Sequence, residues 1–186
     1  MTCRKLRRFE PALLHRWLQL PPEHQKLVSE FGEPEHLLWH LRRLELLAEA
    51  VRLLAYALPE REAVWWSCMC VRRTAASLPD AERGAVEAAE AWVRCPEPAA
   101  RHEAALAASA SGYAAPGAWS ALGAAWSQRE RLLPDLCGGR GAATAVARAA
   151  ARDGPERVQE RLRRFIQSGV DIGNGGAGRI PDESVP

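Results

Sequence analysis

Apolar residues recur at steps of three and four along the longest continuous helical pattern of the chain, residues 35–58. This spacing places them on one face of an α-helix, because each residue turns the chain by about 100° around the helix axis. The positions that form this face are Leu37, Leu41, Leu44, Ala48, Val51, Ala55 and Leu58. Further leucines beside the face widen it, so we expect one helix over residues 35–58 that lies centrally and contacts neighbours on two sides.

Prolines divide the rest of the chain at intervals of 17 to 25 residues, and most of these prolines are followed directly by Glu or Asp. Proline is tolerated at the first position of a helix, and an acidic residue in the first turn interacts favourably with the positive end of the helix dipole. Each interval therefore holds about one helix and one turn. The predicted helices, besides residues 35–58, are residues 11–20, 59–73, 80–94, 97–109, 116–128, 142–152 and 155–168. Residues 23–30 are a candidate for one more short helical segment.

Two glycine-rich stretches lack helical spacing and are predicted to be irregular. Residues 134–141, with Gly138, Gly139 and Gly141, are predicted to form a loop. The stretch over residues 169–186 is predicted to be a tail, of which the last six residues are mobile.

These elements predict an all-α fold with a single domain of about seven to eight short antiparallel helices. Both an irregular bundle and a HEAT-like array of helical hairpins fit the pattern, since no repeat is visible residue by residue. The expected organisation is a basic N-terminal arm with a short helix over residues 1–20, an all-helical domain over residues 21–180 and a mobile tail over residues 181–186.

The composition agrees with an all-helical fold, because alanine is abundant whereas valine, isoleucine and threonine are scarce. The net charge is only +2, and the 25 basic and 23 acidic residues are interleaved along the chain, which argues against nucleic-acid binding. The preference for arginine over lysine is explained by a GC-rich genome.

The five cysteines form no C-x-x-C motif and no paired framework, which is typical of reduced thiols in the cytoplasm. The longest uncharged run, residues 104–128, is too weakly apolar and too broken for a transmembrane helix. No targeting signal is recognised at the N-terminus. We therefore expect a cytoplasmic protein that does not insert into membranes.

Two short motifs are rejected, one because its structural context is wrong and the other because it has too few ligands. The string from Gly173 to Gly178 satisfies G-x-G-x-x-G, but a helix rather than a strand precedes it, so it does not predict a nucleotide site. The stretch from Asp171 to Asp182 has too few oxygen ligands for calcium. We expect no cofactor and no metal.

Two histidines leave one chemical alternative open. Glu33, His36 and His40 share a helix face and provide half of a di-iron motif, but the chain has no second Glu-x-x-His. A small helical enzyme or metal-binding protein that uses His36 and His40 is thus the less favoured interpretation.

Arginines next to tryptophans form the candidate binding site. Arg61, Trp65, Trp66, Arg72 and Arg73 lie within three to four turns of one predicted helix, and Trp and Arg are the residue types most often found as binding hot spots. Neighbouring tryptophans point about 100° apart, so at least one is a candidate for a surface groove. The simpler interpretation places the rings in the core and the arginines in solvent.

Three segments together carry a family resemblance. They are Arg61-Glu62-Ala63-Val64-Trp65-Trp66-Ser67-Cys68-Met69-Cys70, Ala88-Ala89-Glu90-Ala91-Trp92-Val93 and Gly169-Val170-Asp171-Ile172-Gly173. Over about residues 45–180 the chain resembles an uncharacterised family of small bacterial proteins, often encoded near type VI secretion components. The resemblance implies that the segment after Asp171 is part of the folded unit, and it makes Asp171 a second candidate contact. It implies no catalytic residue.

From the resemblance and the hot-spot residues we expect a non-enzymatic protein-interaction module. The first expectation is an adaptor or chaperone-like accessory of a type VI secretion system, with a secretion component as its partner. The second is an immunity protein that binds and neutralises a toxin. The predicted contact residues are the same in both cases, namely Arg61, Trp65, Trp66, Arg72, Arg73 and Asp171.

Overall fold

The computed structural model describes residues 6–8, 11–127 and 137–181. Within these ranges the chain is all-helical and contains no strand, so the predicted fold class is confirmed. The α-helices are α1 (Pro11–Leu18), α2 (Leu27–Glu30), α3 (Pro34–Arg43), α4 (Leu47–Ala57), α5 (Glu60–Arg73), α6 (Asp80–Arg94), α7 (Pro98–Ser111), α8 (Pro116–Trp126), α9 (Gly138–Ala150) and α10 (Val158–Gly173). Short 3-10 turns at Pro22–His24 and Pro155–Arg157 complete the described structure.

Proline marks the helix starts, as the sequence predicts. Pro34 and Pro116 occupy first helical positions, whereas Pro59 and Pro79 stand directly before α5 and α6. The fixed φ of proline suits these positions, and its missing N–H removes a donor that would have no partner there. The predicted mobile tail lies outside the described residues except for Pro181.

The single helix predicted over residues 35–58 is wrong, because the chain turns sharply between α3 and α4. Glu45 adopts a left-handed conformation with φ of 58°. The N–H of Leu46 donates to the Leu41 carbonyl (2.9 Å), and the N–H of Glu45 donates to the Arg42 carbonyl (3.2 Å). This pair of bonds is a Schellman helix end, which usually has glycine at the left-handed position. Because glutamate occupies the left-handed position, the sequence does not indicate that a helix ends here.

The predicted loop over residues 134–141 is also wrong in its second half, because α9 begins at Gly138. The glycines of its first turn are buried and allow very close packing. A Cβ atom on Gly141 would lie 2.4 Å from the Gly123 nitrogen in α8, and one on Gly139 would lie 2.8 Å from the Ala55 carbonyl oxygen in α4. Backbone thus approaches backbone on two sides of α9. Residues 134–136 lie outside the described part.

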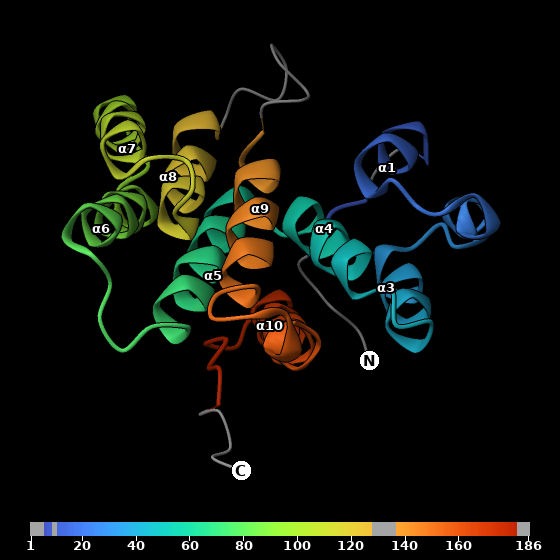
Figure 1. The fold of residues 1–186 in the computed structure, drawn as a ribbon. Coiled ribbons are helices and arrows are strands. Elements are labelled where there is room, and N and C mark those ends of the chain that lie inside the picture. The colour runs from blue at the N-terminus through green and yellow to red at the C-terminus, as the bar shows by residue number, and fades with distance from the viewer. Residues whose placement is uncertain (1–5, 9–10, 128–136, 182–186) are drawn as a thin grey trace.

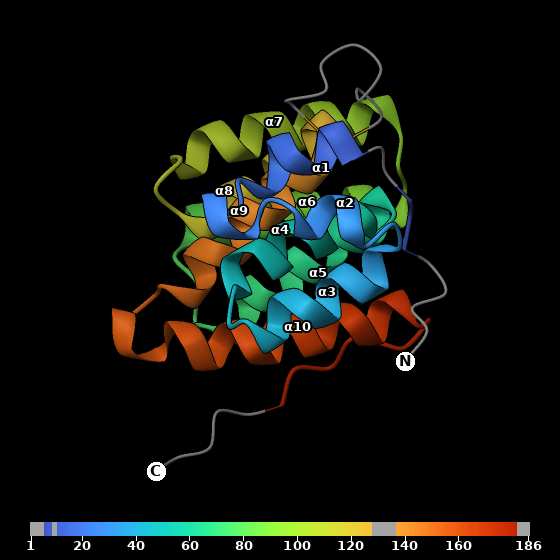
Figure 2. The ribbon, with the colours of Figure 1, turned by 90° about the vertical axis from the view of Figure 1, so that its right-hand side faces the viewer.

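Helices α5 and α9 occupy the middle of the molecule (Figure 1). Helices α6, α7 and α8 pack on one side of them, and α1, α3 and α4 lie on the other side. Helix α10 runs along one edge of the bundle and α7 along the opposite edge (Figure 2). Because α9 contacts α4 and α5, and α10 contacts α4, helices distant in sequence are direct neighbours. This arrangement is the irregular bundle rather than the HEAT-like array, in which each unit contacts only its neighbours in sequence.

A buried ion pair fixes the far end of α9. The Glu82 carboxylate of α6 accepts hydrogen bonds from the Arg152 guanidinium (2.6 Å) and from the Gly117 backbone N–H at the start of α8 (3.0 Å). Glu82 is buried. Removal of one partner of a buried pair leaves an uncompensated charge, so this contact specifies how three helices meet.

The segment after α10 folds back onto that helix. Asp171 accepts a hydrogen bond from the Gly178 N–H through its carboxylate (2.7 Å), and the Ser168 hydroxyl donates to the Gly178 carbonyl (2.5 Å). Ile180 packs against the core. The glycine-rich stretch up to Pro181 therefore belongs to the fold, as the family resemblance implies.

Glycine substitutions test the close packing of α9. Gly141→Ala is expected to lower the free energy of unfolding by more than about 3 kcal/mol, because its Cβ would overlap the α8 backbone. Gly84→Ala in α6 is the matched control, since a Cβ there meets nothing within 4 Å. The control should raise the stability by about 0.5–1 kcal/mol. Urea denaturation measures both, and an unchanged midpoint for Gly141→Ala would contradict the described packing.

Candidate functional site

Trp66, one of the predicted contact residues, lies in the core. Its side chain has 0% exposure, and its indole N–H donates to the Phe165 carbonyl of α10 (2.9 Å). Gly169 leaves room for the ring, because a Cβ at that position would lie 3.0 Å from the Trp66 ring. The prediction of a surface role for Trp66 is therefore wrong. The ring anchors α10 on α5.

Trp65 remains at the surface, with 38% of its area exposed. Two arginines on the same face of α5 are held by α6. Arg61 donates to the Val93 carbonyl through Nε (3.0 Å) and Nη2 (2.7 Å), and Arg72 forms a two-bond fork with the Glu90 carboxylate (2.6 and 2.8 Å). These arginines join α5 to α6. Trp65 is the exposed ring between them.

Arg73 and Asp171 belong to a different part of the molecule. Arg73 donates from Nε to the Pro181 carbonyl (3.1 Å), and Asp171 holds Gly178 as described above. Both residues fasten the C-terminal segment. The structure thus places Arg61, Trp65 and Arg72 together along the α5–α6 edge, and it places Arg73 and Asp171 beside the segment after α10.

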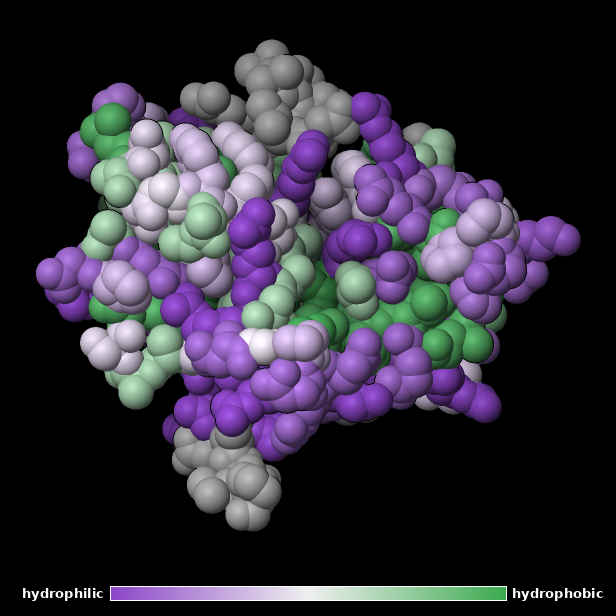
Figure 3. Space-filling view, in the orientation of Figure 1, coloured by the Kyte–Doolittle hydropathy of each residue, from purple (hydrophilic) through white to green (hydrophobic). Residues whose placement is uncertain are grey.

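An arginine-lined groove, which sequence reasoning did not single out, opens between α1, α4 and α9. Its volume is about 530 Å³, which is within the range of ordinary ligand sites. Hydrophilic residues stand on both sides of a hollow between α9 and the α1–α4 side of the molecule (Figure 3). The lining residues are Arg16, Trp17, Gln19, Ala48, Val51, Arg52, Tyr56, Arg140, Ala143, Thr144, Ala147 and Arg148.

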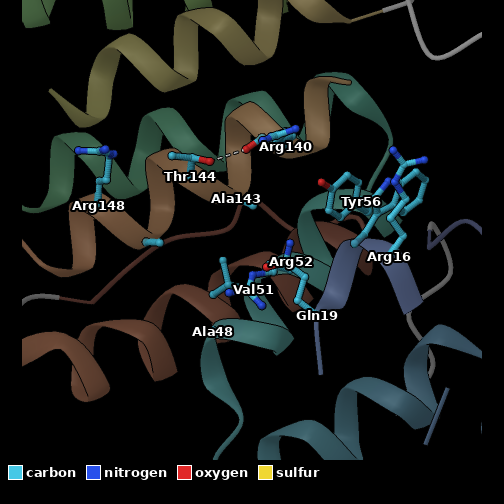
Figure 4. Close-up of a pocket in the computed structure, with 12 residues that line it drawn as sticks. Arg16, Gln19, Ala48, Val51, Arg52, Tyr56, Arg140, Ala143, Thr144 and Arg148 are labelled. Atoms are coloured by element: carbon cyan, nitrogen blue, oxygen red, sulfur yellow. Dashed lines mark hydrogen bonds between the residues drawn. The ribbon is translucent and has the colours of Figure 1, made fainter. Parts of the chain in front are cut away.

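The three helices contribute different parts of the groove. Arg140 and Arg148 stand at opposite ends of the α9 wall, with Thr144 between them (Figure 4). Arg52 extends from the α4 wall and donates from Nη1 to the Leu18 carbonyl at the end of α1 (2.6 Å). This bond attaches α1 to α4. Arg16 completes the end of the groove near Tyr56 (Figure 4).

Two stacked aromatic rings close that end. The rings of Trp17 and Tyr56 lie 4.3 Å apart between centroids at an interplanar angle of 7°, and both side chains are buried. Stacking of this kind adds to the energy of burial. The rings therefore hold α1 against α4 and give the groove a rigid apolar end.

The charge of the groove is basic. Four of its twelve described lining residues are arginines and none is acidic. Glu49 lies near, since its carboxylate is 3.4 Å from Arg52 Nη1. Arg148 donates to the Ala114 carbonyl (3.3 Å) and lies 5.6 Å from the Trp119 ring centroid, and neither contact neutralises its charge. Such a surface suits a carboxylate or another anion, because guanidinium presents a planar set of donors.

The residues considered for catalysis or metal binding are dispersed. His40 in α3 stacks on Phe31 at 3.9 Å between centroids, away from the groove. Across the described ranges, no three His, Cys, Asp or Glu side chains come close enough together to hold a metal ion. In the same ranges no helix combines the length and the apolar character needed to cross a membrane.

The sequence contained two signals for this groove. Arg52 interrupts an otherwise apolar stretch of α4, and Arg140, Thr144 and Arg148 recur at four-residue steps on one face of α9. The second signal is masked by Gly138, Gly139 and Gly141, which predict a loop over residues 134–141. That α1, α4 and α9 come together could only be learned from the structure.

Comparison with protein-family models matches residues 37–173 to a family of unknown function, DUF6931. No curated protein matches the chain, and no solved structure matches it. The match covers α4 and α9, which form two walls of the groove, and it begins after α1, which forms the third.

The two neighbouring tryptophans are expected to respond differently to truncation. Trp66→Ala should cost about 3–5 kcal/mol of stability, because it leaves a large cavity and removes the bond to Phe165. Trp65→Ala should cost about 1–2 kcal/mol, since a part of that ring is already in water. Chemical denaturation of both variants and of the unmodified protein measures these two losses of stability. Equal losses would contradict the assigned burial.

Cysteine labelling provides a second test of burial. Burial, assisted by Glu90, raises the pKa of Cys68 to about 12, and burial also raises the pKa of Cys70. Both thiols therefore stay protonated and inaccessible at pH 8. Among the cysteines of the described ranges, Cys95 is exposed and should react first with iodoacetamide. Mass spectrometry of labelled peptides identifies the order, and fast labelling of Cys68 in the folded protein would be the contrary result.

Proposed function

The chain belongs to DUF6931, a family of unknown function. We propose, from the arrangement of side chains in its groove, that the protein is a non-enzymatic protein-binding module. Its groove between α1, α4 and α9 holds an acidic segment of a partner protein. The observation that carries this proposal is the set of four arginines from three helices around one cavity without an acidic lining residue among those described.

The side chains of the groove support binding rather than chemistry. The described lining residues include no histidine, cysteine or carboxylate, so among them the hydroxyls of Thr144 and Tyr56 have no general base beside them. Arginine and large aromatic rings are typical of binding hot spots. Arg52 is already ordered by its bond to Leu18, which lowers the entropy lost when a ligand binds.

The biological setting of this module follows from the family resemblance described above. We assign it to the bacterial cytoplasm as an adaptor or chaperone-like accessory of a type VI secretion system. An immunity protein would use the same basic groove on an acidic segment of a toxin. The identity of the partner separates these two roles.

The exposed edge of α5 supports protein binding as a second contact. Trp65 lies there between Arg61 and Arg72, both fixed by α6. The tryptophan side chain has only two rotatable torsions, so it loses little conformational freedom on binding. We regard this edge as an extension of the interface rather than as its centre, because it carries two arginines, whereas four surround the groove.

Charge reversal in the groove tests the proposal. The tagged protein is captured from its own cells, and the bound proteins are identified by mass spectrometry. The double variant Arg16→Glu with Arg140→Glu is expected to lose the partner by tenfold or more, since opposite charge in the groove repels an acidic segment.

The matched control is Arg83→Glu with Arg94→Glu, which makes the same change in net charge on exposed positions of α6. This control should retain the partner. If both double variants retain it, or both lose it equally while folded, the groove is not the site.

A further inference from the structure

The outer face of α3 carries a largely exposed tryptophan. Leu37, Leu38 and Leu41 bury the inner face of this helix, which lies on the side of the bundle that faces the viewer in Figure 2. Trp39 is on the opposite face, and 51% of its area is exposed, compared with 38% for Trp65. Tryptophan is enriched at binding hot spots, and the burial of exposed aromatic area favours association. The outer face of α3 is therefore a candidate interaction surface.

Two neighbours hold the Trp39 ring in place. The guanidinium carbon of Arg43 lies 4.7 Å from the ring centroid, and the His40 ring meets Trp39 edge-on at 4.8 Å between centroids. His40 is itself stacked on Phe31. Because these contacts already order the Trp39 ring, little side-chain freedom remains to be lost when a partner covers it. A guanidinium that stacks on a ring also keeps its in-plane N–H groups available for a carboxylate.

Opposite charges stand at equal distances on either side of Trp39. Glu35 is four residues before it and Arg43 is four residues after it, so the three side chains form one ridge along the helix. Within the described ranges, neither the Glu35 carboxylate nor the Arg43 guanidinium takes part in an ion pair. The ridge therefore presents a negative charge at one end, a positive charge at the other end and an apolar ring between them.

This ridge is complementary to a second copy of itself when the two helices run antiparallel. A twofold axis beside Trp39 places Glu35 of each copy next to Arg43 of the other copy, and it places the two rings side by side. Ridges of residues four apart align when two helices cross at about 50°, which is the commonest packing class in globular proteins. A parallel pair would instead place glutamate against glutamate and arginine against arginine, so the charges select the antiparallel arrangement.

We infer that α3 is a self-association surface, through which two copies of this chain form an antiparallel pair around Trp39. The pair is held by two Glu35–Arg43 contacts between the copies and by the covered rings. A helix of ten residues buries less than the about 1,200 Å² of a stable interface, so the pair is weak and reversible. Glu35, Trp39 and Arg43 do not line the groove, and the inference is independent of the proposed function.

Sedimentation equilibrium of the full chain measures the pairing. The unmodified protein is expected to pass from monomer to dimer over about 5–500 μM, because a Kd in the micromolar range populates both species there. Trp39→Ala should raise the Kd by about tenfold or more, since the ring lies at the axis of the pair. Arg94→Glu, at an exposed position of α6, is the control for a reversed charge and should leave the Kd unchanged.

Exchange of the charges distinguishes this pair from any other dimer. Glu35→Arg sets arginine against arginine across the axis, and Arg43→Glu sets glutamate against glutamate, so each variant alone should dimerise at least about tenfold more weakly. An equimolar mixture of the two variants should form heterodimers and regain most of the lost affinity, because every charge then meets its opposite. Circular dichroism of each variant verifies that it remains folded.

Each outcome decides for or against the pair. Dimerisation of the unmodified protein, its loss in the single variants and its recovery in the mixture together support the inference. A monomer at all concentrations overturns it and leaves the face of α3 to a different protein. A dimer that Trp39→Ala and both charge reversals leave unchanged also overturns it, since the contact then lies elsewhere. Weakened pairing that the mixture does not restore overturns the antiparallel arrangement and the inference with it.

Discussion

The close approach of α9 to α8 and α4 is the constraint on which the rest of this fold depends. Gly141 lies against the backbone of α8, and Gly139 lies against the backbone of α4. Any side chain at these positions would push the helices apart, and a small shift in α9 would move Arg140 and Arg148 with it. The same contacts therefore hold the core together and set the width of the groove.

Much of the fold follows from local sequence chemistry. Pro34 and Pro116 begin helices as predicted, and α6 has the predicted bounds. The predictions failed where the local signal was atypical. Glu45 occupies a left-handed position that usually belongs to glycine, and the glycines of α9, which usually indicate a loop, serve instead for close helix packing. In both places a tertiary contact outweighs the local preference of the residue.

The candidate site was less predictable than the fold. Trp65 and Trp66 are adjacent in sequence, and only the position of α10 determines that Trp66 is buried while Trp65 is exposed. The arginines of the groove are separated by up to 132 positions along the chain, from Arg16 to Arg148. No periodic pattern links α1 to α9, so their convergence depends on the packing of the whole bundle. Arg61, Arg72 and Arg73, which the sequence favoured, were found to stabilise contacts within the protein.

The attachment of α1 has a consequence for how binding preferences diverge among relatives. Two walls of the groove lie within the residues shared with the family, whereas Arg16 and Trp17 belong to a segment that precedes them. That segment is held by the bond from Arg52 to the Leu18 carbonyl, by the stack of Trp17 on Tyr56, and by Leu14 and Leu18, which are buried in the core. A relative that shares only residues 37–173 would therefore share the α4 and α9 walls of the groove and would need a wall of its own in place of α1.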